Sequence, residues 1–431
     1  MSGVANVFVL GLDDRNLQLV EGLPGLPPCR YHPLLRREEI MSDAHDLPRL
    51  LEMAEERLCS AGAVPDALIG YWDFPVTSMV PILCHRHGLP APDLRAVATC
   101  EDKYWSRLEQ QRVTTAHPAF SLVDLGPERP APPAGVGYPM WLKPVKSYSS
   151  ELAYKAADRA EFDAAVAGIK HGIDRVGSDF DHLLSMLDAL PPEIAAAGGR
   201  ACLAEEEVHG HQLTVEGYCH RGEPHVYGAI DSACYPGTSS FLCYRYPSAL
   251  PPEVVDRATG ISTRVLRRIG LDRCTFNIEF FWDAERDRLD ILEINPRLSQ
   301  SHAPLFAFVD GAPNLQAMVR LALGLAPELP HRAGDFAVAG KWHLRTFRGD
   351  AVVRRSPSPD DLARLHAEFP EAIVDIPATA GLRLSELYAQ DSYSYELAAV
   401  YLGGQDDDDL AAKWDRCVQL LPFELDEEAI G

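Results

Sequence analysis

The sequence lacks any run of about 20 consecutive apolar residues, the length that a helix needs to cross a bilayer. Its first residues, MSGVANVFVLGLDD, contain no basic leader and become acidic at once, so the sequence predicts no signal peptide. It also lacks any C-x-x-C pair, and its ten cysteines are scattered along the chain. Scattered cysteines are typical of reduced thiols rather than of a disulfide or zinc framework. We therefore expect a cytoplasmic protein that has no membrane partner.

Positive charge is scarce as well. The chain has 40 Lys and Arg residues against 63 Asp and Glu residues, which gives a formal net charge of −23. A protein that binds the phosphates of nucleic acid needs clustered Lys and Arg. The acidic balance therefore argues against nucleic acid as a partner, whereas an anionic small molecule needs only a locally basic pocket.

Several common site motifs are missing. The turn at Gly11 is not followed by further glycines at the spacing of a dinucleotide-binding fingerprint, and no G-x-S-x-G nucleophile motif occurs. The one metal-like cluster, CHRH at residues 84–87, runs into the turn sequence GLP. We interpret this cluster as the end of a helix.

The segments that are present indicate a mixed protein, partly α/β and partly α+β, with several domains. A length of 431 residues predicts roughly two to four domains. Buried strands followed by helices predict a small open α/β domain over residues 1–95. A Pro- and Gly-rich stretch at 125–139 marks a loop or subdomain boundary, and the last hundred residues alternate strand and helix.

The stretch FNIEFFWDAERDRLDILEINPR, residues 276–297, is the most informative part of the chain. It predicts two apolar strands joined by a charged turn. Because strand side chains alternate between faces, Glu293, Asn295 and Arg297 share one face. Antiparallel pairing about the turn places Glu279 directly opposite Glu293. Opposed like charges repel, so we expect a positive group between the two carboxylates.

This face predicts a magnesium–nucleotide site. Glu279, Glu293 and Asn295 offer the hard oxygen ligands that Mg²⁺ prefers, usually together with substrate phosphates. Arg297 is placed to stabilise a transferring phosphoryl group or a developing oxyanion. The alternative is a surface hairpin with an ion-paired face. The apolar flanks of both strands favour a central position, where unpaired charge is costly.

Three further features are candidates for binding phosphate. Lys143 lies in the apolar strand WLKPV, where an ammonium group is costly unless it meets an anion; the alternative is a snorkelling lysine at a sheet edge. Lys103 lies in the predicted helix CEDKYWSRLEQQRV, where an ordinary surface lysine is the alternative. The loop SYSS, which includes Ser149 and Ser150, offers hydroxyl and backbone N–H donors, or is a plain polar turn.

Together these residues resemble the motifs of the ATP-grasp superfamily, in particular its carboxylate–amine ligase branch, with the L-amino acid ligases as the nearest likeness. Biotin carboxylase and carbamoyl phosphate synthetase are similar to a lesser degree. The segment CLAEEEVHGHQLTVEG is similar to the family's hinge, in which an acid is followed five residues later by Gly and seven residues later by another acid. The resemblance implies a pre-grasp domain at 1–95, an ATP-grasp domain at 96–330 with a small mobile lid at about 138–204, and a C-terminal α+β domain at 331–431.

The resemblance also implies a role for each matching residue. At the nucleoside, it implies Glu205 for the adenine amino group, Val208 for backbone contact with the ring and Gln212 at the ribose. At the phosphates, it implies contacts from Lys103 and Lys143, with Ser149 and Ser150 covering them. The implied metal ligands are Glu279, Glu293 and Asn295, and Arg297 is the implied catalytic arginine of the N-P-R signature. Two features depart from the family pattern. The phosphate loop is rich in serine rather than glycine, and Gln212 replaces an acid.

The implied reaction joins a small carboxylate to an amine, both of them small molecules such as amino acids. It uses ATP and Mg²⁺, or Mn²⁺ in its place, and passes through an acyl phosphate to release ADP and phosphate. Arg245 is a candidate clamp for a substrate carboxylate or else a surface arginine, and His302 is a candidate substrate contact or else a packing histidine. The C-terminal residues cap the amine site or form a homodimer face.

Two other functions remain open. One is a biotin-carboxylase-like carboxylase, although no M-K-M biotin-carrier segment occurs in the chain. The other is a nucleotide-binding regulatory module without ligase activity.

Overall fold

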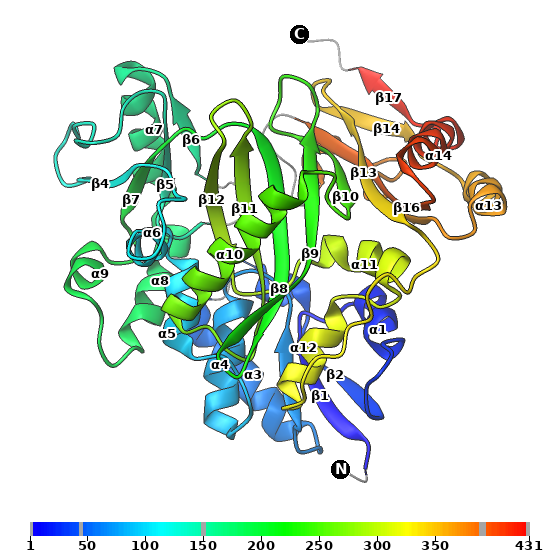
Figure 1. Cartoon of the computed structure of the whole chain (residues 1–431), viewed down its shortest axis with the longest axis horizontal. Helices are drawn as coiled ribbons and strands as arrows, with labels where there is room; N and C mark the ends of the chain where they lie inside the picture. Colours follow the sequence, from blue (N-terminus) through cyan, green and yellow to red (C-terminus); the bar gives the residue numbers. More distant parts are fainter. Residues whose placement is uncertain (1–2, 43–45, 148–151, 388–393, 428–431) are drawn as a thin grey trace.

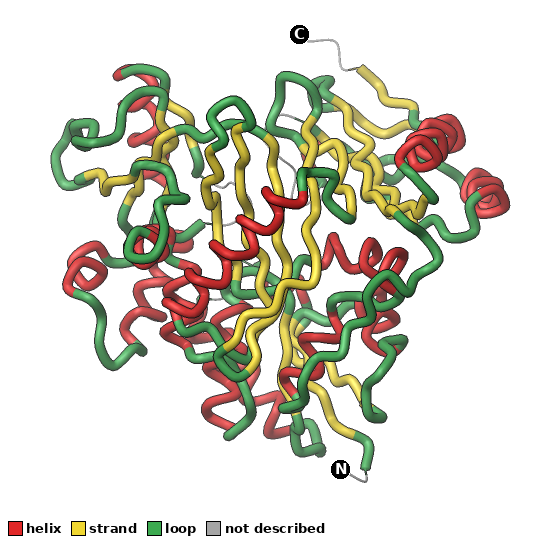
Figure 2. Tube along the Cα trace, in the orientation of Figure 1, coloured by secondary structure: helices red, strands yellow, loops and turns green. Residues whose placement is uncertain are grey.

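The computed structural model describes residues 3–42, 46–147, 152–387 and 394–427, so Ser149 and Ser150 lie outside the described residues. Within these ranges the chain forms four sheets. Figure 1 shows the largest sheet at the centre of the molecule, and Figure 2 shows helices on its flanks. No described helix is both long enough and apolar enough to cross a bilayer.

The N-terminal part of the chain forms a parallel three-stranded sheet with its helices. Its elements are β1 (Ala5–Leu10), α1 (Asp14–Glu21), β2 (Cys29–Leu35), α2 (Arg37–Ile40), α3 (Leu47–Ser60), β3 (Ala67–Gly70) and α4 (Val76–His87). The strand order is β2–β1–β3. Alternate residues of β1 face two different cores: Phe8 packs on the side of α3 and α4, and Val7 packs on the other side. The strands and helices expected in this region are therefore present.

A second, antiparallel sheet of four strands follows. This part of the chain comprises α5 (Leu94–Glu101), α6 (Lys103–Gln110), β4 (Phe120–Val123), β5 (Met140–Pro144), β6 (Tyr154–Ala156), α7 (Arg159–Gly172), α8 (Asp174–Ser185), α9 (Pro192–Ala197) and β7 (Cys202–Glu206). The order is β4–β7–β5–β6, and α7 covers one face through Phe162 and Leu142. Phe180 and Ile194 pack into the N-terminal core. Helices α8 and α9, inside the expected lid, therefore belong with that core.

The third and largest sheet has eight antiparallel strands. The rest of the chain comprises β8 (His211–His220), β9 (Glu223–Cys234), β10 (Phe241–Tyr246), α10 (Pro252–Ile269), β11 (Cys274–Asp283), β12 (Arg288–Asn295), the 3-10 turn η1 (Gln300–His302), α11 (Ala303–Asp310), α12 (Leu315–Ala322), β13 (Val338–Thr346), β14 (Ala351–Arg355), α13 (Pro359–Glu368), β15 (Ile373–Asp375), η2 (Leu384–Glu386), β16 (Tyr395–Gly404), α14 (Asp407–Leu420) and β17 (Glu424–Glu427). The strand order is β12–β11–β8–β9–β10–β13–β16–β15. Because β13 pairs with β10, the sheet continues past the expected boundary at residue 330. The proposed C-terminal domain thus shares its largest sheet with the preceding one.

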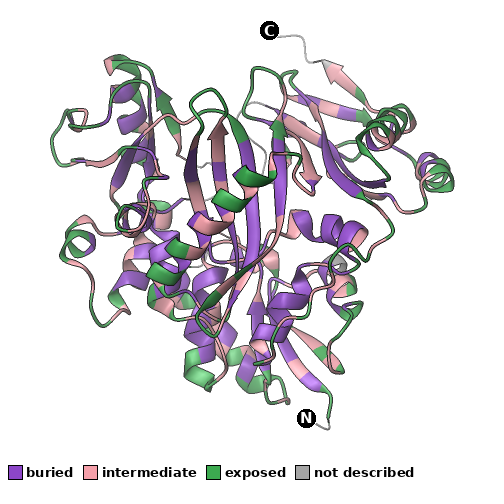
Figure 3. Cartoon of the chain, viewed as in Figure 1, coloured by how far each residue is buried: buried purple, intermediate pink, exposed green. Residues whose placement is uncertain are grey.

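The two faces of this large sheet are covered differently. Helix α10 packs on one face through Val265 against Phe276, and α14 continues that cover through Leu410 against Trp342. Figure 3 shows α10 buried toward the strands and exposed on its outer side. On the opposite face, α11 covers only the far end, through Phe306. The remainder of that face carries the polar residues of the candidate site.

The β11–β12 hairpin has the predicted register. Glu279 and Glu293 are directly paired, and so are Asn277 and Asn295. A bulge follows the acid pair, because Phe280 pairs with Ile291 and leaves Leu292 as the extra residue. The predicted pairing of the two carboxylates is confirmed.

The predicted helix end at CHRH is confirmed, and local sequence explains two helix starts as well. Ser358 caps α13 in a capping box, with acids in the first turn. The acidic run after Gln405 begins α14, where Asp406 is the N-cap and negative charge favours the helix dipole. The CHRH cluster is the last turn of α4, and Gly88 closes that helix in the left-handed conformation.

Candidate functional site

Two carboxylates face each other at the end of the β11–β12 hairpin. Burial, together with the charge of Glu293, raises the pKa of Glu279 to about 7. Gln212 opposes this effect, because its Nε2 donates a hydrogen bond to Glu279 Oε2 at 3.0 Å. Among the described residues, no Lys, Arg or His nitrogen lies within 4.0 Å of the Glu279 carboxylate. Glu279 therefore lacks a cationic partner of its own within the described protein.

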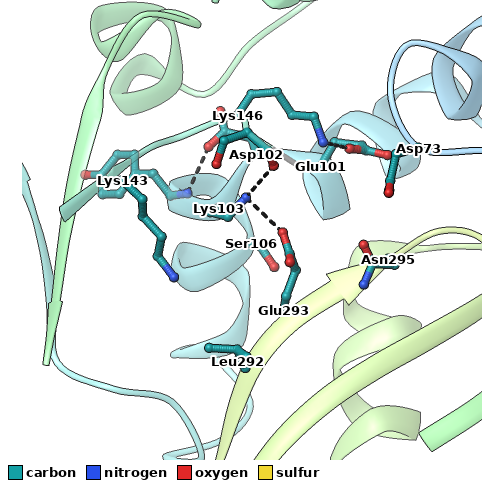
Figure 4. Close-up of polar contacts among 12 residues, drawn as sticks. Asp73, Glu101, Asp102, Lys103, Ser106, Lys143, Lys146, Leu292, Glu293 and Asn295 are labelled. Atoms are coloured by element: carbon teal, nitrogen blue, oxygen red, sulfur yellow. Dashed lines mark hydrogen bonds and ion pairs between the residues drawn. The ribbon is translucent and has the colours of Figure 1, made fainter. Parts of the chain in front are cut away.

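Lys103 supplies the positive group that the sequence predicts beside the acids. Its Nζ lies 2.8 Å from Glu293 Oε1 and donates to the carbonyl oxygen of Ser147 at 2.9 Å. Figure 4 shows Lys103 and Glu293 reaching toward each other from α6 and β12. Burial alone would raise the pKa of Glu293, but the ammonium groups of Lys103, Lys146 and Lys143 hold it below its ordinary value. The two acids thus differ: Glu293 is paired and Glu279 is not.

Asn295 completes a set of oxygen donors on this face. Its Nδ2 donates to Asn277 Oδ1 at 3.0 Å, and Asn277 Nδ2 donates in turn to the carbonyl oxygen of Arg297 at 2.9 Å. This arrangement commits the amide nitrogen of Asn295 and leaves its amide oxygen available. The described residues contain no cluster of three or more His, Cys, Asp or Glu side chains that could hold a metal alone. Two carboxylates and an amide fit Mg²⁺, which commonly takes its other ligands from water and phosphate.

The small sheet adds a buried ion-pair network opposite the hairpin. Lys143 Nζ lies 2.5 Å from Glu205 Oε2, and Arg107 Nε lies 2.6 Å from Glu205 Oε1. Although burial raises the pKa of Glu205, Arg107 and Lys143 lower it to about 2. Arg107 also donates to the carbonyl oxygen of Leu292 at 2.7 Å, so it ties the small sheet to β12. Lys143 and Glu205, predicted at the phosphates and the adenine, are therefore paired with each other here.

The other predicted nucleotide contacts lie close to this network. Val208 is half-buried in the connection between β7 and β8. Gln212 is at the start of β8, where its hydrogen bond to Glu279 joins the predicted ribose position to the predicted metal position. The contacts of Gln212, Arg107 and Lys103 thus bring the hinge, the lysines and the acid pair together where the small and large sheets meet.

Sequence reasoning missed two ion pairs at the edge of this site. Arg297 makes a bidentate pair with Asp73, at 2.7 Å from Nε and 2.8 Å from Nη2. Lys146 makes a buried pair with Glu101, and Figure 4 shows Asp73 and this pair on the same side of Lys103. Asp73 lies three residues after the end of the buried strand β3, and acids just beyond the carboxyl ends of parallel strands are common in α/β sites. The position of Asp73 after β3 was therefore the signal in the sequence that could have identified it as a site residue.

Arg245 is not part of the cluster, contrary to expectation. Its register with Asp231 and Gly340 places it on the opposite face of the large sheet from Glu279. Its guanidinium makes a bidentate pair with Asp407 at 2.7 and 2.8 Å. The residue whose side chain shares the face of the acid pair is its neighbour Tyr244.

His302 is buried, and its Nδ1 lies 2.5 Å from Glu216 Oε1. Glu216 also accepts hydrogen bonds from Tyr227 and Asn314. This closed network matches the packing role, which was the alternative interpretation of His302.

Comparison with known proteins gives the following likenesses. Residues 136–304 match the family described as "ATP-grasp domain". The chain is 29% identical to urea amidolyase from Lachancea kluyveri over 148 residues, which are 34% of this chain and only 8% of that protein. The L-amino acid ligase from Bacillus licheniformis superposes with a TM-score of 0.70 at 12% identity, covering 99% of this chain and 100% of that one. Biotin carboxylase from Campylobacter jejuni, in a β,γ-ATP complex, gives a TM-score of 0.65 at 13% identity, covering 97% and 92%. At these identities the solved structures show a shared fold.

Proposed function

We propose that this chain, whose residues 136–304 match the ATP-grasp domain family and whose fold is shared with an L-amino acid ligase, is an ADP-forming ligase that joins a small carboxylate to an amine. The observation that carries the proposal is the acid pair Glu279 and Glu293, with Asn295 beside it. Lys103 reaches this pair directly, and Lys143 and Arg297 surround it from other elements. A site that concentrates both acids and cations in one gap suits a metal-bound triphosphate.

We assign the roles as follows. Glu279, Glu293 and Asn295 would hold Mg²⁺, which supplies charge neutralisation at the phosphates when it is bound. Lys103 and Lys143 bind phosphate oxygens, and Lys143 exchanges its partner Glu205 for the nucleotide. Arg297 orients the reacting groups, and the bidentate grip of Asp73 fixes the direction of its guanidinium fork.

The proposed reaction has two steps. A carboxylate oxygen of the acid substrate attacks the γ-phosphorus of ATP, the bond to the β–γ bridging oxygen breaks, and ADP leaves. The amine then attacks the carbonyl carbon of the acyl phosphate, the C–O bond to phosphate breaks, and the amine loses a proton. Phosphoryl transfer depends mainly on positioning and charge stabilisation. Water must stay out, and the small sheet lies where it can close over the site.

The test is an assay of ADP and phosphate release with ATP, Mg²⁺ and pools of amino acids as both acid and amine. Release of ADP and phosphate that depends on the added amino acids supports the ligase function. AMP with pyrophosphate contradicts it, and nucleotide binding without turnover under any pool supports a regulatory module instead.

A biotin-carboxylase-like activity is the second candidate. The likeness to biotin carboxylase covers nearly the whole chain, and urea amidolyase is similar over 148 residues. ADP release that requires bicarbonate and biotin, and not an amine, would favour this function.

We also keep the cytoplasm as the proposed compartment, since the ten cysteines are all free thiols. A homodimer is a separate proposal, which light scattering on the purified chain tests.

A further inference from the structure

A second group of polar side chains crosses the same face of the large sheet, beyond the acid pair. Directly paired residues of antiparallel strands project to the same face. One such row runs across five strands and consists of Gln212, Ser232, Tyr244, Lys341 and Tyr401. Gln212 begins this row and is hydrogen-bonded to Glu279, so the row starts at the proposed metal site.

Lys341 is the unusual member of the row. It is 8% exposed, and its Nζ donates to Ser301 Oγ at 3.0 Å. The rings of Tyr244 and Tyr401 lie 5.7 and 5.4 Å from that nitrogen. Throughout the described chain, no carboxylate lies within 4.0 Å of Lys341 Nζ. A lysine ammonium has three donors, and the one hydrogen bond that the structure gives it is to a neutral hydroxyl.

The neighbours of Lys341 show that this arrangement is particular to it. His343 and Arg345, further along β13, both pair with Glu396. These two groups therefore contact an anionic partner directly, whereas Lys341 interacts with the Glu396 charge only beyond ion-pair distance and directly contacts a hydroxyl and two aromatic faces. A buried charge without a counter-ion is costly, and aromatic faces offset only part of that cost. An anion that enters from outside would complete the site.

The position of Lys341 relative to the acid pair limits which anion this can be. Four strand spacings separate β11, which carries Glu279, from β13, which is roughly 19 Å between backbones. A reacting carboxylate beside the metal is too far away to contact Lys341 as well. Yet Ser301, the partner of Lys341, follows Arg297 by only four residues. A segment of four residues reaches at most roughly 14 Å, so the partner of Lys341 lies within that reach of Arg297.

Tyr244 lies between the two groups. Burial and the charges of Glu279 and Glu396 raise the pKa of Tyr244, so its hydroxyl remains a neutral hydrogen-bond donor. Its ring meets His302 edge-on at 5.1 Å and His343 edge-on at 5.2 Å. Two histidine contacts thus fix the orientation of the Tyr244 ring beside Lys341, on the strand between Lys341 and the acid pair.

We propose that Lys341 and Ser301 bind a carboxylate that does not react, and that the amine substrate carries this group. The inference rests on the proposed ligase function and deepens it: the amine substrate is an amino acid whose own carboxylate remains free in the product. A single ammonium with neutral donors around it suits a monoanionic carboxylate better than a phosphate, which needs more cationic donors.

The experiment compares wild type with Lys341→Met, using a panel of amino acids and their carboxamides as the amine and a fixed pool of acids. ADP release is measured at varied amine concentration. Wild type is expected to favour the amino acid over its amide at least tenfold in kcat/KM. Lys341→Met is expected to lose that preference through a higher KM for the amino acid, with the KM for ATP unchanged.

Two further variants control this comparison. Lys413→Met removes a half-buried lysine on the opposite face of the sheet, where α14 lies, and should change neither preference nor turnover. Lys341→Gln keeps a polar atom near Ser301 and serves if the methionine variant does not fold. It is expected to lose the same preference. A merely structural lysine would change stability or kcat without changing the ratio between amino acid and amide.

Failure of this inference and failure of the ligase function give different results. If Lys341→Met or Lys341→Gln retains the preference, or if the preference depends on the acid component instead, the Lys341 assignment is overturned while the ligase function stands. If wild type releases no ADP with any pair, the ligase function fails. The carboxylate site is then tested by the rise in melting temperature that amino acids cause in the presence of MgADP. A rise in wild type that is lost in Lys341→Met supports the site. An equal rise in both proteins, or no rise in wild type, overturns it.

Discussion

The polar face of the large sheet has two halves that differ in charge. Within the described residues, the half on the β11–β12 hairpin carries an unpaired acid, and the half on β13 carries an unpaired lysine. On the β11–β12 hairpin, Glu279 has a neighbouring carboxylate and an amide but no cation within ion-pair distance. On β13, Lys341 has a hydroxyl and two rings but no carboxylate within that distance. Buried groups of this kind are normally compensated, so each half indicates what is bound there. The hairpin half suits a cation with a nucleotide, and the β13 half suits an organic anion.

The largest expected effect comes from breaking the acidic half. Glu293→Gln replaces a charged carboxylate ligand of the proposed metal, which is also the ion-pair partner of Lys103, by a neutral amide of nearly the same volume. We expect turnover to fall at least about 100-fold, with the melting temperature little changed. Steady-state ADP release measures this effect. Glu285→Gln, at an exposed position of the same hairpin turn, is the matched control. An active Glu293→Gln enzyme would remove the metal assignment.

Weakening the ion pair that Asp73 makes with Arg297 should have the second largest effect on turnover. Asp73→Asn weakens the bidentate grip on Arg297, because a neutral amide accepts less strongly than a carboxylate. We expect kcat to fall roughly 10- to 30-fold with the KM for ATP unchanged, since Arg297 acts on the reacting groups. Asp66→Asn, in the same N-terminal region, serves as the control. A change confined to the KM for ATP would contradict the role given to Asp73.

The contribution of the small sheet is tested by Lys143→Met. The variant removes an ammonium that pairs with Glu205 and is proposed to bind phosphate. We expect the affinity for MgADP to weaken about tenfold, which calorimetric titration measures. Lys155→Met, a more exposed lysine of β6 in the same sheet, is the control. Unchanged affinity in Lys143→Met would mean that this lysine serves only to neutralise Glu205.

The β13 half of the face can be tested through the effect of pH on folding stability at His343, which lies on the same strand as Lys341. Burial lowers the pKa of His343 to about 4 from 6.5, although Glu396 opposes the shift. Between about pH 4 and pH 6.5 the imidazole is therefore neutral in the folded chain and protonated in the unfolded chain, so unfolding takes up a proton. The contribution of His343 to the free energy of unfolding is complete above pH 6.5. It decreases as the pH falls toward 4, by at most about 3 kcal/mol.

The measurement is the difference in melting temperature between wild type and His343→Gln at several pH values. The difference should change steadily between pH 6.5 and 4. His171→Gln, at an exposed position on α7, should show no such trend. A pH-independent difference for His343→Gln would show that the histidine titrates alike in the folded and unfolded chain.

The sequence revealed the acidic half more fully than the basic half, for a physical reason. Glu279 and Glu293 belong to one hairpin, so their pairing depends only on the turn between them and on strand alternation. The helix end predicted at CHRH is equally local. The choice between the two interpretations of Arg245 was open in the sequence, because the face that a residue of β10 presents depends on pairing with β9, where a bulge shifts the register.

Contacts between distant segments were beyond the reach of these local rules. Asp73 and Arg297 are separated by 224 positions in the chain. Lys341 and Ser301 meet only because β13 joins the edge of β10, across the boundary expected at residue 330. No periodicity or motif in one sequence records such a pairing. The same limit explains why α8 and α9 were assigned to the lid, although their apolar faces complete the N-terminal core.

The most direct test of the account is the anomalous scattering of Mn²⁺ in crystals grown with Mn²⁺ and ADP. The account predicts one strong peak between the carboxylates of Glu279 and Glu293, within roughly 2.5 Å of an oxygen of each, with nucleotide phosphate on its open side. A bound nucleotide whose metal lies away from both carboxylates would contradict it.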